Sequence, residues 1–174
     1  ELKDKEWMAL VKLNIGNSHF YRGNMRQSID NYYKALLIFT EIDNKVSIGE
    51  ACNNIGSVYS AWGEYDKSLE YFERAREIYE LTGDERNLAR VLSNMAEVYN
   101  YEQKDFQKAK QLYEQSLNIK IKINDLMGVA MQNHNLGTLY ANIEDYDKAK
   151  KYFEISENLY DDMESKTGLV MVYH

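Results

Sequence analysis

Apolar and small residues recur along almost the whole chain at the spacing that places them on one face of a helix. Short clusters rich in Gly, Asn and Asp interrupt this pattern, for example around Gly23, Asn44 and Gly63. Glycine commonly ends helices, and Asn and Asp side chains bond the free N–H groups where a helix begins. The pattern therefore predicts consecutive helices separated by short turns.

The same pattern returns every 40 or 41 residues, which indicates an internal repeat. An asparagine followed two residues later by a small residue sets the register: Asn14 with Gly16, Asn54 with Gly56, Asn94 with Ala96, and Asn135 with Gly137. An aromatic residue follows at an equivalent place in each unit: Tyr32, Phe72, Tyr113 and Phe153. The one additional residue of the third unit falls in the turn around Gln103-Lys104.

Residues that can cap a helix stand ten positions before each of these asparagines and again before a fifth unit: Asp4, Asn44, Asp84, Asp125 and Ser165. A second helix is expected to open in each unit at Asn24, Glu64, Asp105 and Asp145. Each unit is thus predicted to be a helical hairpin. The expected units are 4–43, 44–83, 84–124 and 125–164, followed in 165–174 by the start of a fifth unit or a capping helix, all in one solenoid domain.

Glycine inside a helix costs about 1 kcal/mol relative to alanine, so Gly16, Gly56 and Gly137 need a reason. We expect these positions, with Ala96, to lie where the two helices of a hairpin cross closely. The aromatic residue of the second helix would fill the space beside each. These glycines are therefore predicted to be structural.

These residues resemble the tetratricopeptide repeat family over essentially the whole chain. The family's small–aromatic pattern reads here as Gly56, Tyr59, Ser68, Phe72 and Ala75. The units are longer than the usual length of about 34 residues, and the proline that normally ends them is absent. This longer variant is similar to repeats of kinesin light chains and of bacterial intracellular peptide receptors and regulators. The resemblance implies an all-α, right-handed α-solenoid of antiparallel helix hairpins.

In such a solenoid the first helices of the hairpins line the concave groove. Helical spacing places a set of candidate partner-binding side chains in this groove: Asn53, Asn54, Arg90, Asn94, Glu97, Tyr101, His134 and Asn135. Arg90 is the one cation that this register directs into the groove, which opposes recognition of an acidic peptide C-terminus. The expected partner is a protein or peptide segment, extended or helical.

Asparagine occupies one repeat position in all four units, and two interpretations stay open. Amides donate and accept hydrogen bonds, so Asn54, Asn94 and Asn135 could form a ladder that holds the backbone of a bound segment, with Asn53, Arg90 and Tyr101 adding selectivity. Alternatively, each asparagine could bond to the neighbouring hairpin and fix the stacking of the repeats.

Composition narrows the function classes. The chain has 174 residues and no proline, as expected of a chain made almost wholly of helix. Its formal net charge of −7 opposes binding to a phosphate backbone. Cys52 is the single cysteine and falls in an apolar pattern, so a buried thiol is expected. No apolar run reaches the length of a membrane span, and a cytoplasmic location is expected without membrane association.

Catalytic and metal-ligating patterns find no support in the sequence. His19 takes a packing position of the repeat, and His134 has no Ser or Cys nucleophile at a matching place. No cofactor or metal is expected. The leading interpretation is a non-enzymatic scaffold for protein or peptide interaction. The alternative is a peptide-sensing or dimerisation module of a larger bacterial-type signalling or transcription regulator.

The two ends of the predicted stack lack the polar cap that terminal repeats normally carry. The segment 167–174 matches 127–134, and its Leu169, Val170, Met171 and Val172 are apolar. These uncapped ends allow self-association of the chain.

Overall fold

The computed structural model describes residues 2–172, with side chains from 2 to 102 and from 104 to 163. Within these residues every regular element is a helix, which confirms the predicted all-α fold. The elements are α1 (Leu2–Tyr21), α2 (Met25–Glu41), α3 (Lys45–Ala61), α4 (Tyr65–Thr82), α5 (Glu85–Val98), the π-helix η1 (Tyr99–Gln103), α6 (Phe106–Lys122), α7 (Leu126–Asn142) and α8 (Tyr146–Val172).

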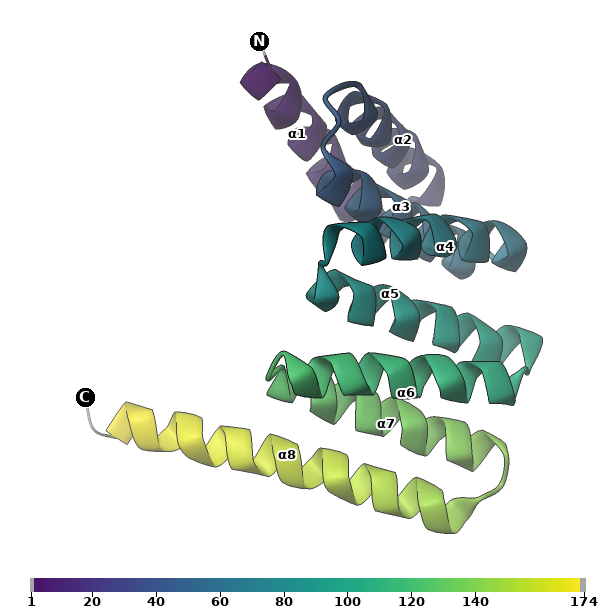
Figure 1. The fold of residues 1–174 in the computed structure, drawn as a ribbon, viewed down its shortest axis with the longest axis vertical. Helices are drawn as coiled ribbons and strands as arrows, with labels where there is room; N and C mark the ends of the chain where they lie inside the picture. The colour runs from purple at the N-terminus through teal and green to yellow at the C-terminus, as the bar shows by residue number, and fades with distance from the viewer. Residues whose placement is uncertain (1, 173–174) are drawn as a thin grey trace.

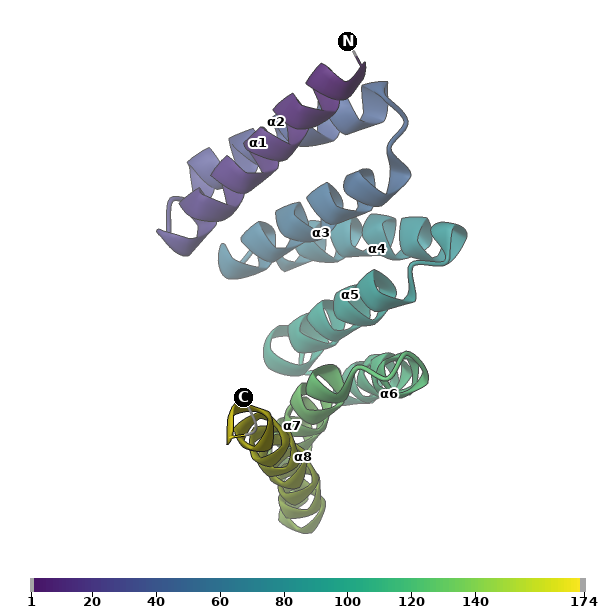
Figure 2. The same ribbon diagram turned by 90° about the vertical axis from the view of Figure 1, so that its left-hand side faces the viewer.

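The helices pair into four antiparallel hairpins that stack in chain order (Figure 1). Each second helix packs on the first helix of the next hairpin, at the junctions α2–α3, α4–α5 and α6–α7. The first helices also touch one another, α1 with α3 and α3 with α5. Figure 2 shows the resulting curvature, with α3, α5 and α7 on the inner side of the arc and α4 and α6 on its outer side. The arrangement is the solenoid of helix hairpins that the repeat predicts.

Each of the seven connections between helices contains one residue in the left-handed backbone region. The expected turns at Gly23 and Gly63 are confirmed, with φ of 75° and 79°. The other connections use Asp43, Gly83, Lys104, Asn124 and Glu144. Glycine pays no Cβ penalty in this conformation, and Asn and Asp tolerate it better than most residues. The turns are therefore short and sharply defined.

Most of the expected helix caps are present. Asn44 Oδ1 accepts from Ser47 N–H, and Asp84, Asp105 and Asp125 accept from the backbone N–H three residues later in the same way. Asp4 differs from the prediction, because α1 begins at Leu2 and Asp4 already lies in its first turn.

The additional residue of the third unit is accommodated in a π-helix. Residues Tyr99–Gln103 form wider turns after α5, and the chain leaves them through Lys104 at φ of 52°. Asp105 N–H closes the segment on the carbonyl oxygen of Tyr99 at 3.0 Å. A π-turn absorbs one extra residue without shifting the flanking helices. The insertion therefore lies where the sequence predicts it.

The helices of a hairpin cross at the small residues, as predicted. A Cβ placed on Gly16 would lie 2.5 Å from the ring of Tyr32, and one on Gly137 would lie 2.7 Å from Phe153. Such distances are too short for carbon–carbon contact, which is optimal near 3.5–4.0 Å. The absent side chain therefore makes room for the aromatic ring of the second helix.

The chain end differs from the prediction. The helix α8 runs without a break from Tyr146 to Val172, so no new helix starts at Ser165. The side chains of the apolar group Leu169–Val172, and residues 173–174, lie outside the described residues.

Candidate functional site

A cleft of about 360 Å³ opens on the inner side of the arc, between α5 and α7. Three kinds of side chain line it. Cations and carboxylates come from Arg86, Arg90, Glu97, Lys120 and Asp125, amides and a hydroxyl from Asn87, Ser93, Asn94 and Asn135, and apolar surface from Met127, Gly128 and Met131.

Three cations converge on this cleft, which corrects the prediction that Arg90 is the one cation in the groove. Arg86 lies one turn before Arg90 on α5, and Lys120 reaches the cleft from α6, on the outer layer. A prediction that considers only the first helices misses Lys120. The sequence does contain a sign of this role for Lys120. The equivalent positions of the first two repeats hold Phe39 and Tyr79, which are buried core residues, whereas the third repeat has a lysine there.

Lys120 forms part of a buried polar network at the junction of the third and fourth hairpins. Its Nζ donates to Gln132 Oε1 at 2.9 Å and to Ser93 Oγ at 3.2 Å. Ser93 Oγ and Ser116 Oγ also lie 2.6 and 3.2 Å from Gln132 Oε1, and Ser116 Oγ donates to the carbonyl oxygen of Ala89 at 2.7 Å. Burial lowers the pKa of the Lys120 ammonium, and the nearby carboxylates of Asp125 and Glu97 oppose this shift.

The carboxylates of the cleft do not neutralise its cations by direct pairing. Among the described residues, no carboxylate oxygen lies within 4.0 Å of a side-chain nitrogen of Arg86, Arg90 or Lys120. Asp125 instead accepts the backbone N–H of Gly128 as the cap of α7. Desolvation by the cleft walls raises the pKa of the Glu97 carboxyl, an effect that the charge of Lys120 opposes. The cleft therefore keeps cationic donors available to an anionic group.

A chain of amide hydrogen bonds crosses the first three hairpins beside the cleft. Asn54 Nδ2 donates to Asn17 Oδ1 at 3.3 Å, and Asn53 Nδ2 donates to Asn54 Oδ1 at 3.4 Å. Asn94 Nδ2 then donates to Asn53 Oδ1 at 2.9 Å. These bonds join asparagines of successive hairpins, as the stacking interpretation expects. Each amide retains a second N–H donor, so a bound backbone could also engage Asn54 and Asn94.

Seven of the eight candidate residues divide into three groups, and the eighth, Asn54, lies half-buried in the amide chain beside the cleft. Arg90, Asn94, Glu97 and Asn135 meet in the cleft. Asn53 was expected in the groove but is only 3% exposed, because it lies under Asn54 and Asn94 in the junction.

Tyr101 and His134 lie away from the cleft. Tyr101 borders a separate hollow with Asn100, Phe106 and Asn142. His134 lies at the last hairpin, its ring 5.2 Å from that of Phe153, and lines a hollow at the end of the stack. The structure therefore brings fewer of the candidate residues together in one cleft than the sequence predicts. A role in binding stays a prediction for all of these residues.

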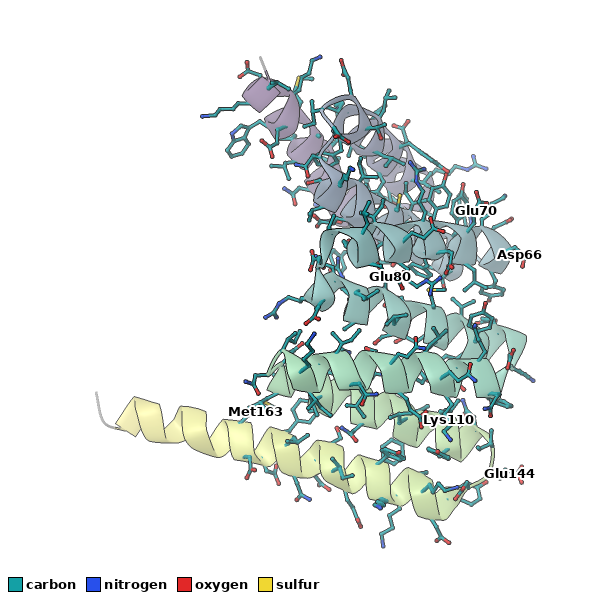
Figure 3. All side chains as sticks on the ribbon, viewed as in Figure 1. Asp66, Glu70, Glu80, Lys110, Glu144 and Met163 are labelled. Carbon is teal, nitrogen blue, oxygen red and sulfur yellow. The ribbon has the colours of Figure 1, made fainter. Side chains whose placement is uncertain are left out.

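Other carboxylates are spread over the outer helices. Figure 3 labels Asp66, Glu70 and Glu80 on α4. Glu80 lies 3.5 Å from the guanidinium of Arg76, four residues earlier on the same helix. The described residues contain no group of three or more His, Cys, Asp or Glu side chains arranged to hold a metal ion. Within the same residues, none of the helices has the length and apolar character needed to cross a membrane.

Comparison with known proteins identifies the repeat. A family model described as Tetratricopeptide repeat matches residues 7–81 and 51–122, and a second model with the same description matches residues 133–155. The chain is 30% identical over 76 residues to the Photosystem I assembly protein Ycf3 of Prochlorococcus marinus subsp. pastoris. That similarity covers 44% of this chain and 42% of the relative.

Solved structures share the fold at lower sequence identity. Aspartyl phosphate phosphatase F from Bacillus subtilis superposes with a TM-score of 0.85 at 15% identity, over 91% of this chain and 42% of that protein. A Rap protein complexed with competence and sporulation factor superposes with a TM-score of 0.78 at 18% identity, over 89% of this chain and 43% of that protein. The chain therefore spans less than half the length of each of these proteins and of the cyanobacterial relative.

Proposed function

The chain belongs to the tetratricopeptide repeat family, and we propose that it is a non-enzymatic scaffold that binds a segment of a partner protein in the cleft between α5 and α7. The observation that carries the proposal is the convergence of Arg86, Arg90 and Lys120 on one inner cleft without a carboxylate in direct contact. Arg86 and Arg90 are exposed at the cleft, and no described carboxylate pairs with either, so their guanidinium groups can bind an anionic group of a ligand.

The chemistry of the cleft suggests what the bound segment contains. Guanidinium groups bind carboxylates through paired hydrogen bonds, so Arg86 and Arg90 favour an acidic side chain or a terminal carboxylate. Met127 and Met131 offer adaptable apolar surface for a neighbouring aliphatic or aromatic side chain. Asn94 and Asn135 can bond peptide groups between them. The net charge of −7 supports a protein ligand over a nucleic acid.

A sensor or dimerisation module of a larger bacterial-type regulator is the second candidate. The Rap protein, whose structure is complexed with competence and sporulation factor, shares this fold over 43% of its length. The chain covers 43% of that protein, and regulation of an effector would require further sequence. The peptide-sensing form of this candidate also requires the cleft to bind a protein segment.

Peptide display tests the proposal directly. Random 12-residue peptides are selected on the 174-residue chain, and the selected peptides are titrated by fluorescence anisotropy. We expect peptides that combine an acidic residue with an apolar one. Arg90→Ala and Met131→Ser should each weaken their binding roughly tenfold or more, since a lost charge-assisted bond or apolar contact removes about 1.5–3 kcal/mol.

The matched control is Arg26→Ala, which removes an exposed arginine from α2 on the outer layer. It should leave the affinity unchanged. Peptides whose binding responds equally to Arg26→Ala and Arg90→Ala would locate the interaction elsewhere and contradict the proposal. Circular dichroism melting of each variant confirms that the exposed substitutions leave the fold intact.

A further inference from the structure

A hollow on the outer side of the arc lies apart from the cleft between α5 and α7. It measures about 380 Å³ and opens between α4 and α6. Met95 of α5 and Leu112 of α6 are buried in its apolar wall, beside the half-buried Tyr99 at the start of η1. The first and fourth hairpins continue the stack on either side of this outer hollow. The ends of the chain therefore do not explain why it is open.

In the second unit, tyrosines fill the equivalent place. The counterparts of Tyr99 and Leu112 are Tyr59 and Tyr71, whose rings stack with their centroids 5.8 Å apart. Tyr33 of α2 completes this cluster, with its hydroxyl oxygen 2.8 Å from that of Tyr71. The chain itself thus shows that a tyrosine side chain fits at this place of the repeat.

The fourth unit has the same stack. Its counterparts are Tyr140 and Tyr152, whose rings lie 5.3 Å apart with an interplanar angle of 8°. Only a leucine, Leu112, stands where these two units have the second tyrosine. Within the described residues, Tyr99 therefore has no ring stacked on it, and the outer hollow opens beside it.

A lysine accompanies each of these tyrosine stacks. Lys67 Nζ lies 5.5 Å from the ring centroid of Tyr59, and Lys148 Nζ lies 5.1 Å from that of Tyr140. Lys108 occupies the equivalent position of the third unit and lines the outer hollow. The third unit therefore keeps the first ring and the lysine and lacks the second ring.

The carboxylates around the outer hollow favour a basic ligand with a hydrogen-bond donor. Glu73 is the counterpart of Tyr33 and pairs with Arg76 through Oε1, which leaves Oε2 as an acceptor. Asp66 and Glu70, labelled in Figure 3, are exposed one turn apart on α4. In the described part of the chain, no side-chain nitrogen lies within 4.0 Å of either carboxylate.

We infer that the outer hollow binds a tyrosine side chain of a partner segment, which stacks on Tyr99 where the other two units place their own second ring. The phenol hydroxyl donates to the Glu73 carboxylate, and basic residues beside the tyrosine lie next to Asp66 and Glu70. Tyrosine is among the residues that contribute most binding energy at protein interfaces. The site is separate from the cleft of the proposed function.

Methyl NMR with short peptides tests the inference. Acetyl-Lys-Tyr-Lys-amide is titrated against the 174-residue chain, and the methyl resonances of Met95 and Leu112 are followed. We expect saturable shifts with a Kd of about 1 mM, in a titration that extends to about 10 mM. Acetyl-Lys-Leu-Lys-amide keeps the charges without the ring and should bind at least about fivefold more weakly.

Leu112→Tyr supplies the missing ring from the chain itself. It should abolish the shift of the Met95 methyl at an unchanged melting temperature, because Tyr71 and Tyr152 fit at the same repeat position. The matched control is Leu37→Tyr, which adds a tyrosine at a position that is 72% exposed on α2. It should leave the peptide affinity unchanged.

Glu70→Lys keeps the test decisive if Leu112→Tyr does not fold, because Glu70 is exposed. It should weaken binding of the tyrosine peptide at least about threefold, whereas Glu77→Lys makes the same charge change at an exposed position of α4 outside the hollow and should have less than about a twofold effect. Equal losses in these two variants overturn the inference, as does the absence of saturable shifts. Undiminished binding to a folded Leu112→Tyr variant, or tighter binding of acetyl-Lys-Leu-Lys-amide or acetyl-Lys-Arg-Lys-amide, overturns it as well.

Discussion

The ring of Phe72 lies directly over the Cα of Gly56, where an added Cβ would be 2.6 Å from Phe72 Cδ1. In an open helix, Gly56→Ala would stabilise the protein by about 1 kcal/mol. Here the methyl group must displace a fully buried ring, and overpacking costs about 1–3 kcal/mol. The difference is a net loss of up to about 2 kcal/mol in the free energy of unfolding, measured by urea denaturation.

Because the Phe72 ring causes this loss of stability, a smaller side chain at position 72 should reduce the loss. In a Phe72→Leu background, Gly56→Ala should cost less than it does alone, in a double-mutant cycle. The third hairpin carries Ala96 at the equivalent position beside Tyr113, and both are buried. Ala96→Gly should therefore lower the free energy of unfolding by about 1 kcal/mol. If all of these crossing positions simply favoured glycine, the same substitution would stabilise the protein. If Gly56→Ala stabilised the protein, close crossing would not explain this glycine.

The network around Gln132 predicts a strong coupling with Lys120. Gln132→Leu removes the acceptor for Lys120 Nζ and leaves a charged, half-buried group with one fewer partner. The expected loss is about 2–3 kcal/mol in the free energy of unfolding. Adding Lys120→Met should recover at least about 1 kcal/mol of it, because the corresponding position of the first junction holds Phe39 against Ala51 without any charge. Additive losses would show that the two side chains are independent.

The repeat explains why so much of the fold follows from the sequence. Each helix start, turn and helix crossing is predicted from equivalent positions in four units. Where one residue is atypical for its position, the equivalent residues of the other units still indicate the structure. Gly56, Asp84 and the insertion near Gln103 could all be located in this way. Ser165 could not, because the type of the preceding residue does not decide whether the helix ends: Glu144 adopts the left-handed conformation before Asp145, whereas α8 continues through Glu164.

The candidate site is less predictable than the fold. Neighbouring residues on one helix can fall on either side of the boundary between a buried junction and the open cleft, and a helical wheel drawn from the sequence does not resolve a difference of one residue. Asn53 and Asn54 are adjacent, yet Asn53 is buried in the junction while Asn54 is half-buried. Lys120 could not be placed from the register of the inner helices, because its long side chain reaches the cleft from the outer layer.

Cys52 offers a test of core integrity. Its side chain is fully buried, and burial raises the pKa of the thiol to about 11. At pH 8 only about one thiol in a thousand is ionised, and thiolate is the reactive form. We expect Cys52 to react with Ellman's reagent on the timescale of unfolding in native buffer and within seconds in 6 M guanidinium chloride. Rapid native labelling would contradict the packing of α3 on α4.

Buried tyrosines predict a loss of stability in alkaline solution. Burial raises the pKa of the Tyr79 hydroxyl to about 12, an effect that Arg90 opposes. A pKa raised above its unfolded value near 10 gives stability that is complete below pH 10 and is lost as pH rises toward 12. For Tyr79 the lost contribution amounts to about 2–3 kcal/mol at most.

Tyr79→Phe removes this ionisation. Its stability relative to the wild type should therefore rise between pH 8 and pH 11.5, when urea denaturation is measured at both values. Tyr146→Phe serves as the control, because Tyr146 is 67% exposed. Parallel pH profiles of Tyr79→Phe and wild type would exclude Tyr79 as a source of alkaline unfolding.

Asn94 and Asn135 occupy the same repeat position in different surroundings, so they separate the two interpretations of the asparagine ladder. Asn94 Nδ2 donates to the buried Asn53 Oδ1 at 2.9 Å, whereas the Asn135 side chain has no hydrogen-bond partner among the described residues. Asn94→Ala should lower the free energy of unfolding by about 1–2 kcal/mol, because Asn53 loses its donor. Asn135→Ala should change it by less than about 0.5 kcal/mol.

Binding of a selected peptide is the second measurement on the same pair. If the amides hold the ligand backbone, Asn135→Ala should weaken binding severalfold at unchanged melting temperature, since about 1 kcal/mol is lost with one hydrogen bond. A double variant, Asn53→Leu with Asn94→Ala, restores the apolar side chain that Leu13 supplies in the first hairpin and should recover part of the lost stability. Unchanged peptide affinity in Asn135→Ala, together with the loss of stability in Asn94→Ala, would assign the ladder to repeat stacking alone.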